Sequence, residues 1–505
     1  MASFDKVEQW LLYMLVVTIP LFGLPKRYPI PEVFRNIPFS ILCLALSLAL
    51  VNCLLSKAKQ KAVQFPISPL VKSYVIITIF WVVLCTVIGV ITFPYWDNSA
   101  NEFLRNTKLV QKISQYYPEI LENDMLLHLK YANSLIIYAF RDLLIPLLGI
   151  PFCLYVLFRN KSVKYIMDTM SKAALFAACA FSLYSLIEIP WLITGNEVCE
   201  DILKIINFHL YDPAISHGWW PPLLWKGQLR SYATEPPLFS IEAVFIIPLL
   251  WYRVFGLRER KTIIVLLFFT FMLYMTRART GQLVLFGELF MLIGLSLVGK
   301  YQNWKSYILE ILVISLLSFS VFMVVGSIGS TTVKGSFDNY VKNDVVSATS
   351  LNSRSNAARW GSTVALMRVG IDHPFFGVGT YLHSPYLSEK IPQFAKEDWE
   401  IKIWMKETKG QGFMEVYVPV MNEYFGILAQ YGIFGLILFF IPIIWVGMKM
   451  VKNRNLLMCN FGMICFIICF LGQLVCLFTN TFVYTFPLSL AVMMELMLSI
   501  GKQSI

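Results

Sequence analysis

The chain has 505 residues, of which 57% are hydrophobic and only 14% are charged. An average soluble domain is roughly 45–50% apolar and about 25% charged, so the composition excludes a soluble globular protein and indicates an integral membrane protein. The formal net charge of +11 does not indicate a nucleic-acid partner, because lysine and arginine accumulate on the cytoplasmic side of membrane proteins in general. We expect the lipid bilayer, and no nucleic acid, among its partners.

Apolar segments recur along the whole chain, and most are long enough to cross about 30 Å of hydrocarbon as a helix. We predict an all-α, polytopic membrane protein with about twelve transmembrane helices. Their approximate ranges are 10–24, 37–55, 69–93, 133–157, 170–193, 236–256, 261–276, 281–299, 305–328, 422–447, 456–476 and 481–500. The first run is short, but no small-residue cleavage motif follows it, which favours an uncleaved helix. The ten cysteines fall mostly inside apolar runs, which predicts buried side chains rather than a disulfide framework or a zinc site.

Basic residues fall in every second short connection, and the positive-inside bias assigns these connections and both chain termini to the cytoplasm. The residues are Lys57, Lys59, Lys61, Arg159, Lys161, Lys164, Arg253, Arg258, Arg260, Lys261, Lys300, Lys305, Lys449, Lys452 and Arg454. The long connections at about 94–132, 195–235 and 329–421 then lie on the outer face. The chain divides into helices one to nine (1–328), a long outer loop (329–421) that carries a short amphipathic helix, and the last three helices (422–505).

Four charged residues lie in the outer halves of predicted membrane helices: Arg141, Asp142, Glu242 and Glu288. At roughly 1.5 Å per residue, each is on the order of 10 Å below the outer surface. Charges at that depth usually face a water-filled cavity or each other. Two interpretations therefore stay open: the outer half of the bundle holds a polar cavity, or Arg141 pairs with Glu242 or Glu288 only to hold helices together.

Several arginines lie on the outer side, where the positive-inside bias gives no reason for them. Arginine presents a fork of donors that matches phosphate or carboxylate oxygens, and it stays charged. The cluster favours an anionic ligand at the headgroup level, and contact with lipid phosphates is the alternative. The residues are Arg230 before the sixth helix, Arg277 and Arg279 between the seventh and eighth, and Arg354, Arg359 and Arg368 in the long loop.

The arginines of the long loop belong to a predicted short helix over 354–370, which we expect Gly370 to end. Its helical period places Arg354 and Arg368 on one face and Arg359 on another. The three side chains therefore cannot hold one phosphate, and we expect Arg354 or Arg359 to bind it.

Two further stretches carry polar groups. His373 precedes Pro374, so it is either a turn residue or a proton-transfer group. Asn422 and Glu423 begin the tenth helix, where asparagine is a preferred N-cap and a carboxylate is favourable.

These motifs in this order, over residues 225–445, resemble the O-antigen polymerase and O-antigen ligase superfamily. The resemblance implies a metal-independent membrane glycosyltransferase without a cofactor. It would use glycans carried on undecaprenyl pyrophosphate, at the periplasmic face of the bacterial inner membrane. The motifs are Arg230…Glu235-Pro236, Arg279-Thr280-Gly281, His373-Pro374-x-x-Gly377-Val378-Gly379 and Asn422…Leu428-x-x-x-Gly432-x-x-Gly435.

Two departures distinguish the branches of this superfamily. In the ligase branch a histidine precedes the asparagine that starts the helix after the long loop, and Met421 stands there in this chain. Arg359 and Gly370 have the Arg-x10-Gly spacing described for polymerases, whereas Ile241 stands where a glycine would follow Arg230. The polymerase branch is therefore favoured, and the spacing supports a role for Arg359 but not for Arg230.

A polymerase of this kind would move a growing glycan from its pyrophosphate lipid to a sugar hydroxyl of an incoming repeat unit. Arginines at the edge of a low-dielectric site would stabilise the departing pyrophosphate, and a general base would contribute about 10²–10⁴-fold. The expected base is Glu235, Glu423 or His373, in that order. The expected substrate-binding residues are Arg230, Arg277, Arg279, Arg354, Arg359 and Asn422.

Two other functions compete with this prediction. A ligase would transfer finished glycan to the lipid A core. A transporter of lipid-linked units would normally show repeat symmetry and charges near the membrane midplane, whereas the charges here lie in the outer half. The sequence also leaves open whether a chain-length regulator contacts the bundle.

Overall fold

The computed structural model describes residues 2–58, 69–211, 227–299, 301–328, 356–411, 418–479 and 484–503. Within these ranges the chain is helical and contains no strand. Eight of the described helical segments are long and apolar enough to cross a membrane, and two shorter apolar helices stand near the C-terminus. The chain is therefore a polytopic all-α membrane protein, as predicted. Arg354 lies outside the described residues.

Each of the twelve predicted transmembrane ranges contains a helix. These helices are α1 (Ala2–Thr18), α2 (Ile37–Ala58), α3 (Pro69–Ile91), α7 (Asp124–Ala139) with η2 (Phe140–Gly149) and α8 (Ile150–Phe158), α9 (Val163–Thr194), α11 (Pro236–Trp251) with η3 (Tyr252–Gly256), α12 (Ile263–Met275), α13 (Arg279–Gly299), α14 (Trp304–Ile328), α20 (Glu423–Lys452), α22 (Phe461–Cys476) and α23 (Thr485–Gln503). The other helices are η1 (Glu32–Arg35), α4 (Asn98–Arg105), α5 (Lys108–Ser114), α6 (Glu119–Glu122), α10 (Glu197–Leu210), η4 (Arg260–Thr262), α17 (Asn356–Asp372), α18 (His383–Lys390), η6 (Gln393–Ala395), α19 (Trp399–Gln411) and α21 (Arg454–Met458).

Helix α11 is the centre of the bundle. Of the span formed by α11 and η3, 94% is buried, against 28–44% for the other candidate spans. A helix that is apolar on all sides, as this one is, belongs in the interior, and α9, α12, α13 and α22 pack around it. Because α11 is held on every side, the residues at its beginning are also held in place.

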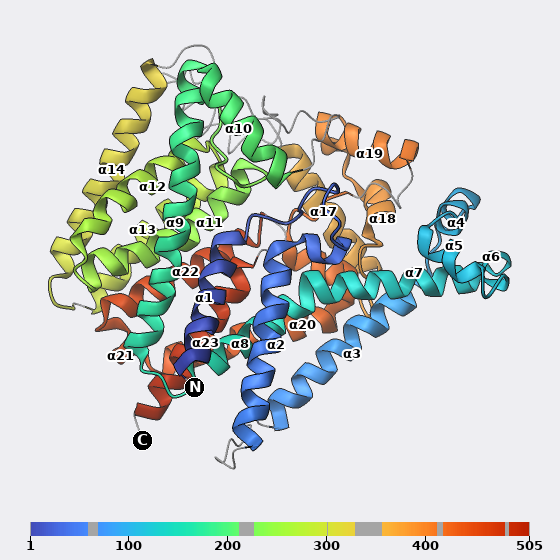
Figure 1. The fold of residues 1–505 in the computed structure, drawn as a ribbon, viewed down its shortest axis with the longest axis horizontal. Helices are drawn as coiled ribbons and strands as arrows, with labels where there is room; N and C mark the ends of the chain where they lie inside the picture. The colour runs from blue at the N-terminus through green and yellow to red at the C-terminus, as the bar shows by residue number, and fades with distance from the viewer. Residues whose placement is uncertain are drawn as a thin grey trace.

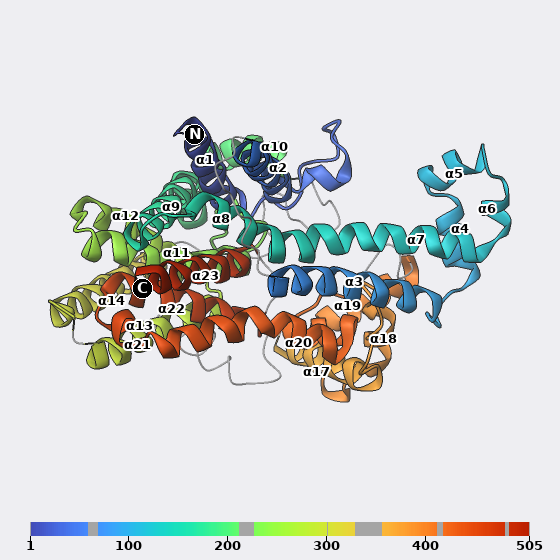
Figure 2. The same cartoon turned by 90° about the horizontal axis from the view of Figure 1, so that it is seen from below.

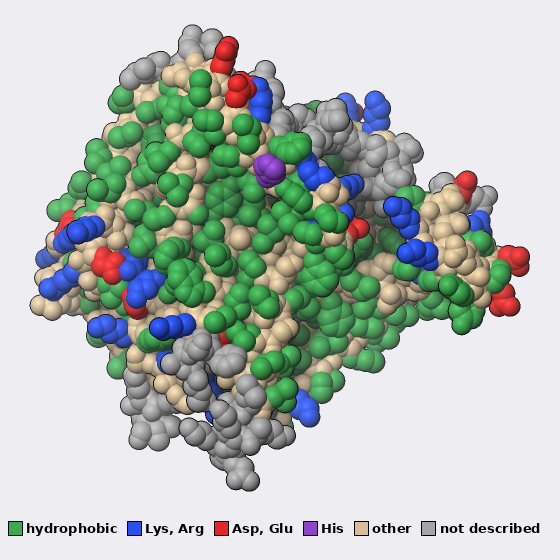
Figure 3. Space-filling view, viewed as in Figure 1, with side chains coloured by type: hydrophobic (Ala, Val, Ile, Leu, Met, Phe, Trp, Pro, Cys, Tyr) green, Lys and Arg blue, Asp and Glu red, His purple; other side chains and the backbone are tan. Residues whose placement is uncertain are grey.

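The two chain termini lie at one end of the bundle, and α10, α17 and α19 lie at the opposite end (Figure 1). Termini at one end are what an even number of membrane crossings would give. We call the end that carries α10, α17 and α19 the outer end. Hydrophobic side chains dominate the face seen in Figure 3, with lysine, arginine and acidic side chains mostly near its margins, as expected for a surface in contact with lipid.

The long connections contain more helix than the sequence predicted. Residues 94–132 form α4, α5, α6 and the first turns of α7, and this group projects from the far end of α7 (Figures 1 and 2). The described part of the long loop contains α17, α18 and α19 rather than a single short helix. Helix α19 is started by the Asp398 carboxylate, which accepts the N–H groups of Glu400 at 2.9 Å and Ile401 at 3.4 Å.

Helix α17 continues to Asp372, so the prediction that Gly370 ends it was wrong. Gly370 is buried inside the helix, and a Cβ there would stand 2.6 Å from Cγ of Leu428. The glycine therefore permits close packing of α17 on α20, and the helix stops only where His373 meets Pro374.

Helix α20 is broken at Gly432, whose φ of 68° and ψ of −171° lie in a region open essentially to glycine alone. A side chain at this position would collide with the carbonyl group of Phe375. Glycine is therefore required by both the backbone and the neighbouring loop. The break takes intrahelical partners away from backbone groups of buried residues, and each such group would cost several kcal/mol if it had no other partner.

The loop at 374–379 supplies most of those partners, so this segment is docked into the break of α20. Ile433 N–H also donates to the Pro374 carbonyl at 2.8 Å, which closes the contact from the other side. The His-Pro-x-x-Gly-x-Gly motif thus supplies hydrogen-bond partners for the backbone at the break in α20. At the break, Val378 N–H donates to the carbonyl of Ala429 at 2.8 Å, Gly379 N–H to that of Gln430 at 3.0 Å, and Trp81 Nε1 to that of Tyr431 at 2.9 Å.

Candidate functional site

The turn that carries Arg230 is fixed by a carboxylate from α9. Glu188 is buried, and its two oxygens accept the backbone N–H of Arg230 at 3.2 Å and of Ser231 at 2.7 Å. Ser231 has a φ of 52°, a conformation that L-residues rarely adopt, and its hydroxyl donates to the carbonyl of Phe181 at 2.9 Å. The turn is thus held in an unfavourable backbone conformation by α9.

Arg230 itself is only 3% exposed. Its Cζ lies 5.4 Å from the ring centroid of Tyr211, and its Nε is buried without a hydrogen-bond partner among the described residues. The guanidinium also interacts electrostatically with Glu188. A buried cation whose donors are partly unused is suited to an anionic ligand.

The second arginine-bearing turn joins α12 to α13 beside the first. Arg277 has a φ of 52°, and the Thr276 hydroxyl accepts the N–H of Ala278 at 3.0 Å within the same turn. Leu229 N–H donates to the carbonyl of Met275 at 3.0 Å, which places the two turns next to each other. Arg279 is the first residue of α13. The structure thus brings together the chain segments of Arg230, Arg277 and Arg279.

Arg359 of α17 stands near two carboxylates, Glu235 and Glu400. Glu235 occupies the N-cap position of α11 but makes no capping hydrogen bond with its side chain, and Glu400 is in the first turn of α19. Burial raises the pKa of Glu235, and burial also raises the pKa of Glu400 to about 7. The guanidinium of Arg359 opposes both shifts, and its own pKa is lowered by burial. The group combines a half-buried cation with two carboxylates of raised proton affinity.

Three successive backbone carbonyl groups directly after α22 accept hydrogen bonds from residues of the predicted site. Asn422 is also the N-cap of α20, as predicted, because its Oδ1 accepts the N–H of Phe425 at 3.1 Å. Helices α17, α20 and α22 therefore meet at one point of the outer end. Glu423 N–H donates to the carbonyl of Leu477 at 2.9 Å, Asn422 Nδ2 to that of Phe478 at 3.1 Å, and Arg359 Nη1 to that of Thr479 at 3.1 Å.

His373 does not join this group. It follows Arg359 by fourteen residues, which is about 21 Å along a helix, and its ring packs edge-to-face against Tyr386 at 5.2 Å. Arg368 is exposed near the same end of α17 and donates to the carbonyl of Lys390 at 3.0 Å. The structure therefore separates His373 and Arg368 from Arg359, and the predicted split between Arg359 and Arg368 is confirmed.

The proposed pairing of Arg141 with Glu242 or Glu288 is wrong. Arg141 binds the carboxylate of the adjacent Asp142 through two hydrogen bonds, of 2.6 Å and 2.7 Å, and Asp142 accepts the hydroxyl of Tyr381 at 2.8 Å. The nearest carboxylate is the next residue of the π-helical segment η2, so no distant partner is needed. The pair instead connects η2 to the loop that follows Gly379.

Glu242 and Glu288 are 1% and 0% exposed, so they lie in helix packing rather than along a polar cavity. Glu288 projects from α13 onto Gly472 of α22, which has no side chain to exclude it. The interpretation that these carboxylates line an outer cavity is therefore not supported by their surroundings.

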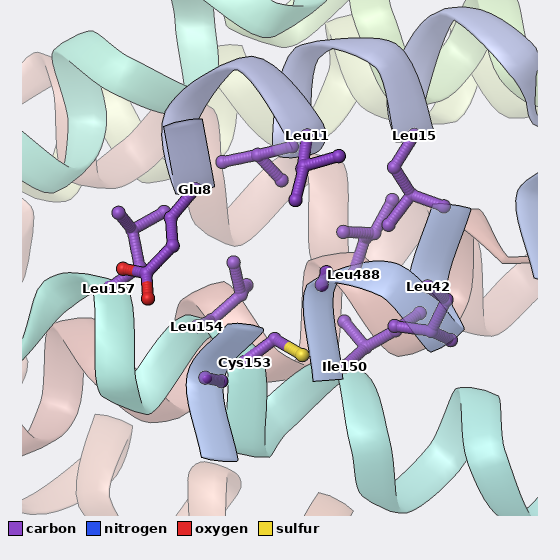
Figure 4. Close-up of a pocket in the computed structure, with 12 residues that line it drawn as sticks. Glu8, Leu11, Leu15, Leu42, Ile150, Cys153, Leu154, Leu157 and Leu488 are labelled. Atoms are coloured by element: carbon purple, nitrogen blue, oxygen red, sulfur yellow. The ribbon is translucent and has the colours of Figure 1, made fainter. Parts of the chain in front are cut away.

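A small cavity of about 30 Å³ lies elsewhere, between α1, α2, α8 and α23 (Figure 4). Its walls are almost entirely leucine, isoleucine and alanine, with Glu8 as the one carboxylate in its lining. Glu8 lies in the first half of α1 and Leu157 near the end of α8. We do not assign the outer-end chemistry to it.

Sequence reasoning missed Glu188 and Glu400. Glu188 is the one acidic residue in the outer half of α9, the same signal that drew attention to Glu242, and it could have been found in that way. Glu400 lies in a stretch rich in both charge signs, and nothing in its spacing marks it. Its approach to Arg359 depends on η6 packing Ala395 against Gly361 of α17.

The fold and the site define a polytopic helical membrane protein with arginines and carboxylates gathered at its outer end, between a central helix and a long helical loop. Residues 264–440 match the family model described as O-antigen ligase. The match covers part of the chain and supports its resemblance to the O-antigen polymerase and ligase superfamily, whose members are membrane enzymes that transfer glycans in surface-glycan assembly. The match includes Arg277, Arg279, Arg359 and Asn422, whereas Glu188, Arg230 and Glu235 precede it. No curated protein matches the chain.

Proposed function

We propose that this protein is a polymerase of the superfamily. It would join oligosaccharide repeat units carried on undecaprenyl pyrophosphate, at the periplasmic face of the bacterial inner membrane and without a metal ion. The observation that carries this proposal is the electrostatic interaction of Arg359 with both Glu235 and Glu400, at the meeting point of α17, α20 and α22. A cation for a departing diphosphate and carboxylates for a hydroxyl proton stand there together.

The reaction requires one bond to form and one to break. A sugar hydroxyl of the incoming unit attacks the anomeric carbon of the growing glycan, and the bond from that carbon to the pyrophosphate oxygen breaks. The electron pair leaves with undecaprenyl pyrophosphate, where Arg230, Arg277, Arg279 and Arg359 would stabilise it. The hydroxyl proton passes to a carboxylate, for which Glu235 is our first candidate. Glu423, whose side chain is 7% exposed, is the second.

The residue before Asn422 supports the polymerase branch. Met421 is half-buried at this position, and its thioether cannot take up a proton near neutral pH. His373, the alternative histidine, lies at the far end of α17. A carboxylate base is therefore the assignment that the described residues favour.

The orientation belongs to the same proposal. Both termini would be cytoplasmic, because they share one end of the bundle with the basic connections, and the outer end would face the periplasm. A chain-length regulator would act on the polymerase as a partner at this outer end.

The decisive cellular experiment deletes the gene and examines the surface glycan. Loss of a polymerase leaves single repeat units attached to the lipid A core, and that is the result we expect. Bare core without any repeat would instead identify a ligase and reject the proposal.

The decisive biochemical experiment supplies purified protein with matched lipid-linked repeat units in detergent. Products longer than the supplied unit are expected, and they would exclude a pure transporter. The matched pair of variants is Arg359→Lys and Arg368→Lys, because both arginines lie on α17 but only Arg359 meets the carboxylates. Absence of elongation by the wild-type protein with correct substrate would reject the polymerase.

A further inference from the structure

Helix α10 has three distinct faces along its length. Leu203 and Asn207 are buried against the bundle, and the Asn207 Oδ1 accepts the hydroxyl of Tyr184 on α9 at 2.8 Å. A second face carries Lys204 and its ion pairs with Glu200 at 2.8 Å and Asp201 at 3.2 Å. The third face is apolar and exposed, although it belongs to a connection between two membrane helices.

The exposed apolar face consists of side chains at helical spacing. Val198, Ile202 and Ile205 are one to two turns apart, and Ile205 is 64% exposed. With an ionic face on one side and the packed face on the other, the pattern is that of a helix lying in a membrane surface. Its position agrees, because α9 ends at Thr194 and α10 begins at Glu197, which leaves no length to carry α10 away from the bilayer.

The C-terminal end of α10 adds a cation to this surface. The Arg27 guanidinium lies 3.5 Å from the ring centroid of Phe208, and its Nη2 donates to the carbonyl of Tyr211 at 3.4 Å. On the other side, the ring of Tyr211 is 5.4 Å from Cζ of Arg230. Arg27 is exposed while Arg230 is buried, so Tyr211 contacts one guanidinium at the surface and one in the interior.

We propose that the apolar face of α10 lies in the outer leaflet and, with Arg27 at its end, forms the surface along which a lipid-linked diphosphate reaches Arg230. This inference rests on the proposed function. A lipid of this class matches the surface in both parts, because its hydrocarbon chain fits Val198, Ile202 and Ile205 and its diphosphate fits a guanidinium at headgroup depth. An ordinary phospholipid would meet the same apolar face but would gain nothing further from the path to Arg230.

The test uses the full-length protein in phospholipid nanodiscs with a benzophenone amino acid in place of Ile205. The matched protein carries the same group in place of Lys204, on the ionic face of the same helix. The probe is radiolabelled undecaprenyl pyrophosphate. We expect labelling from position 205 and little from position 204. Excess unlabelled undecaprenyl pyrophosphate should remove the label, whereas undecaprenol and inorganic pyrophosphate should not.

A second variant tests the cation. Arg27→Gln should weaken competition by unlabelled undecaprenyl pyrophosphate about tenfold, the equivalent of one charge-assisted hydrogen bond. Equal labelling from positions 204 and 205, removal of the label by undecaprenol, or adducts with phospholipid alone would each overturn the proposal.

Elongation of lipid-linked repeat units is measured in the same nanodiscs, so the two proposals fail separately. Labelling and competition as expected without elongation would reject the polymerase but keep the surface. Elongation with equal labelling at both positions would reject the surface and keep the polymerase.

Discussion

Glu188 accepts the backbone N–H of Ser231 at 2.7 Å, and with its other oxygen it accepts that of Arg230. Replacement by alanine would leave two buried N–H groups without acceptors, at a cost of about 1–3 kcal/mol each. We expect Glu188→Ala to lower the thermal unfolding temperature in detergent and to abolish polymer, and Glu188→Gln, which keeps one acceptor oxygen, to fall between alanine and wild type.

The control for this series is Glu197→Gln, which changes an exposed carboxylate at the start of α10. It should unfold and polymerise as wild type does. If Glu188→Ala were as stable and as active as Glu197→Gln, the turn would not depend on the α9 carboxylate.

The second prediction concerns the guanidinium group of Arg359. Lysine keeps the charge but cannot reach the Thr479 carbonyl and a diphosphate in the same way. We predict that Arg359→Lys lowers elongation by about 10²–10³-fold, the usual effect of removing one donor to a developing anion, with normal protein yield. Arg368→Lys should retain activity, and Arg279→Lys should lose it. Full-length polymer from both Arg359→Lys and Arg279→Lys would exclude a role in diphosphate binding.

The raised pKa of Glu400 makes stability depend on pH. Its pKa rises from 4.5 to about 7 on folding, so between these values the folded state binds the proton that the unfolded state releases. This contribution is complete below pH 4.5 and is lost as pH rises through 7. The wild-type unfolding temperature should therefore fall relative to that of Glu400→Gln between pH 5 and about pH 8.

The neighbouring Glu397 provides the control for this titration. Its carboxylate is exposed and bound to Lys402 at 2.6 Å, which lowers its pKa instead. Glu397→Gln should not reproduce the pH dependence of the Glu400→Gln difference. A constant difference between wild type and Glu400→Gln across this range would show that Glu400 does not titrate there.

The break in α20 gives a prediction about the backbone. Gly432→Ala puts a side chain into an essentially glycine-only conformation, which costs about 1–3 kcal/mol, and against the carbonyl of Phe375. We expect a large loss of folded protein by fluorescence-detected size exclusion. Gly447→Ala is the matched control on the same helix, because a Cβ there meets nothing within 4 Å, and it should be neutral or slightly stabilising.

The membrane helices were predictable from the sequence because hydrocarbon thickness sets their length. Every predicted range contains a helix, even where the helix is short, as in α12. The helices of the outer loops were mostly missed, since α4 and α19 are polar and are stabilised by capping carboxylates such as Asp97 and Asp398. Nothing in the apolar pattern marks a helix of that kind.

The candidate site divides in the same way. The arginines were recognised because the positive-inside bias gives no reason for them on the outer side. The separation of Arg359 from Arg368 followed from the helical period of α17. The convergence of Arg359 with Glu400 was not predictable, because it depends on how η6 packs on α17. The contact between the loop at 374–379 and α20 was also not predictable, because a turn motif does not show that it packs against a broken helix some fifty residues further on.

The docked loop also has a consequence for biosynthesis. The donors that fill the break in α20 come from Trp81, Val378 and Gly379, all of which precede residue 429 in the chain. Because a chain is made from its N-terminus and folds progressively, these donors exist before the broken segment leaves the ribosome. The residues that complete helix α20 are therefore synthesised before its break is, and a chain that ends after residue 379 would already contain all three donors.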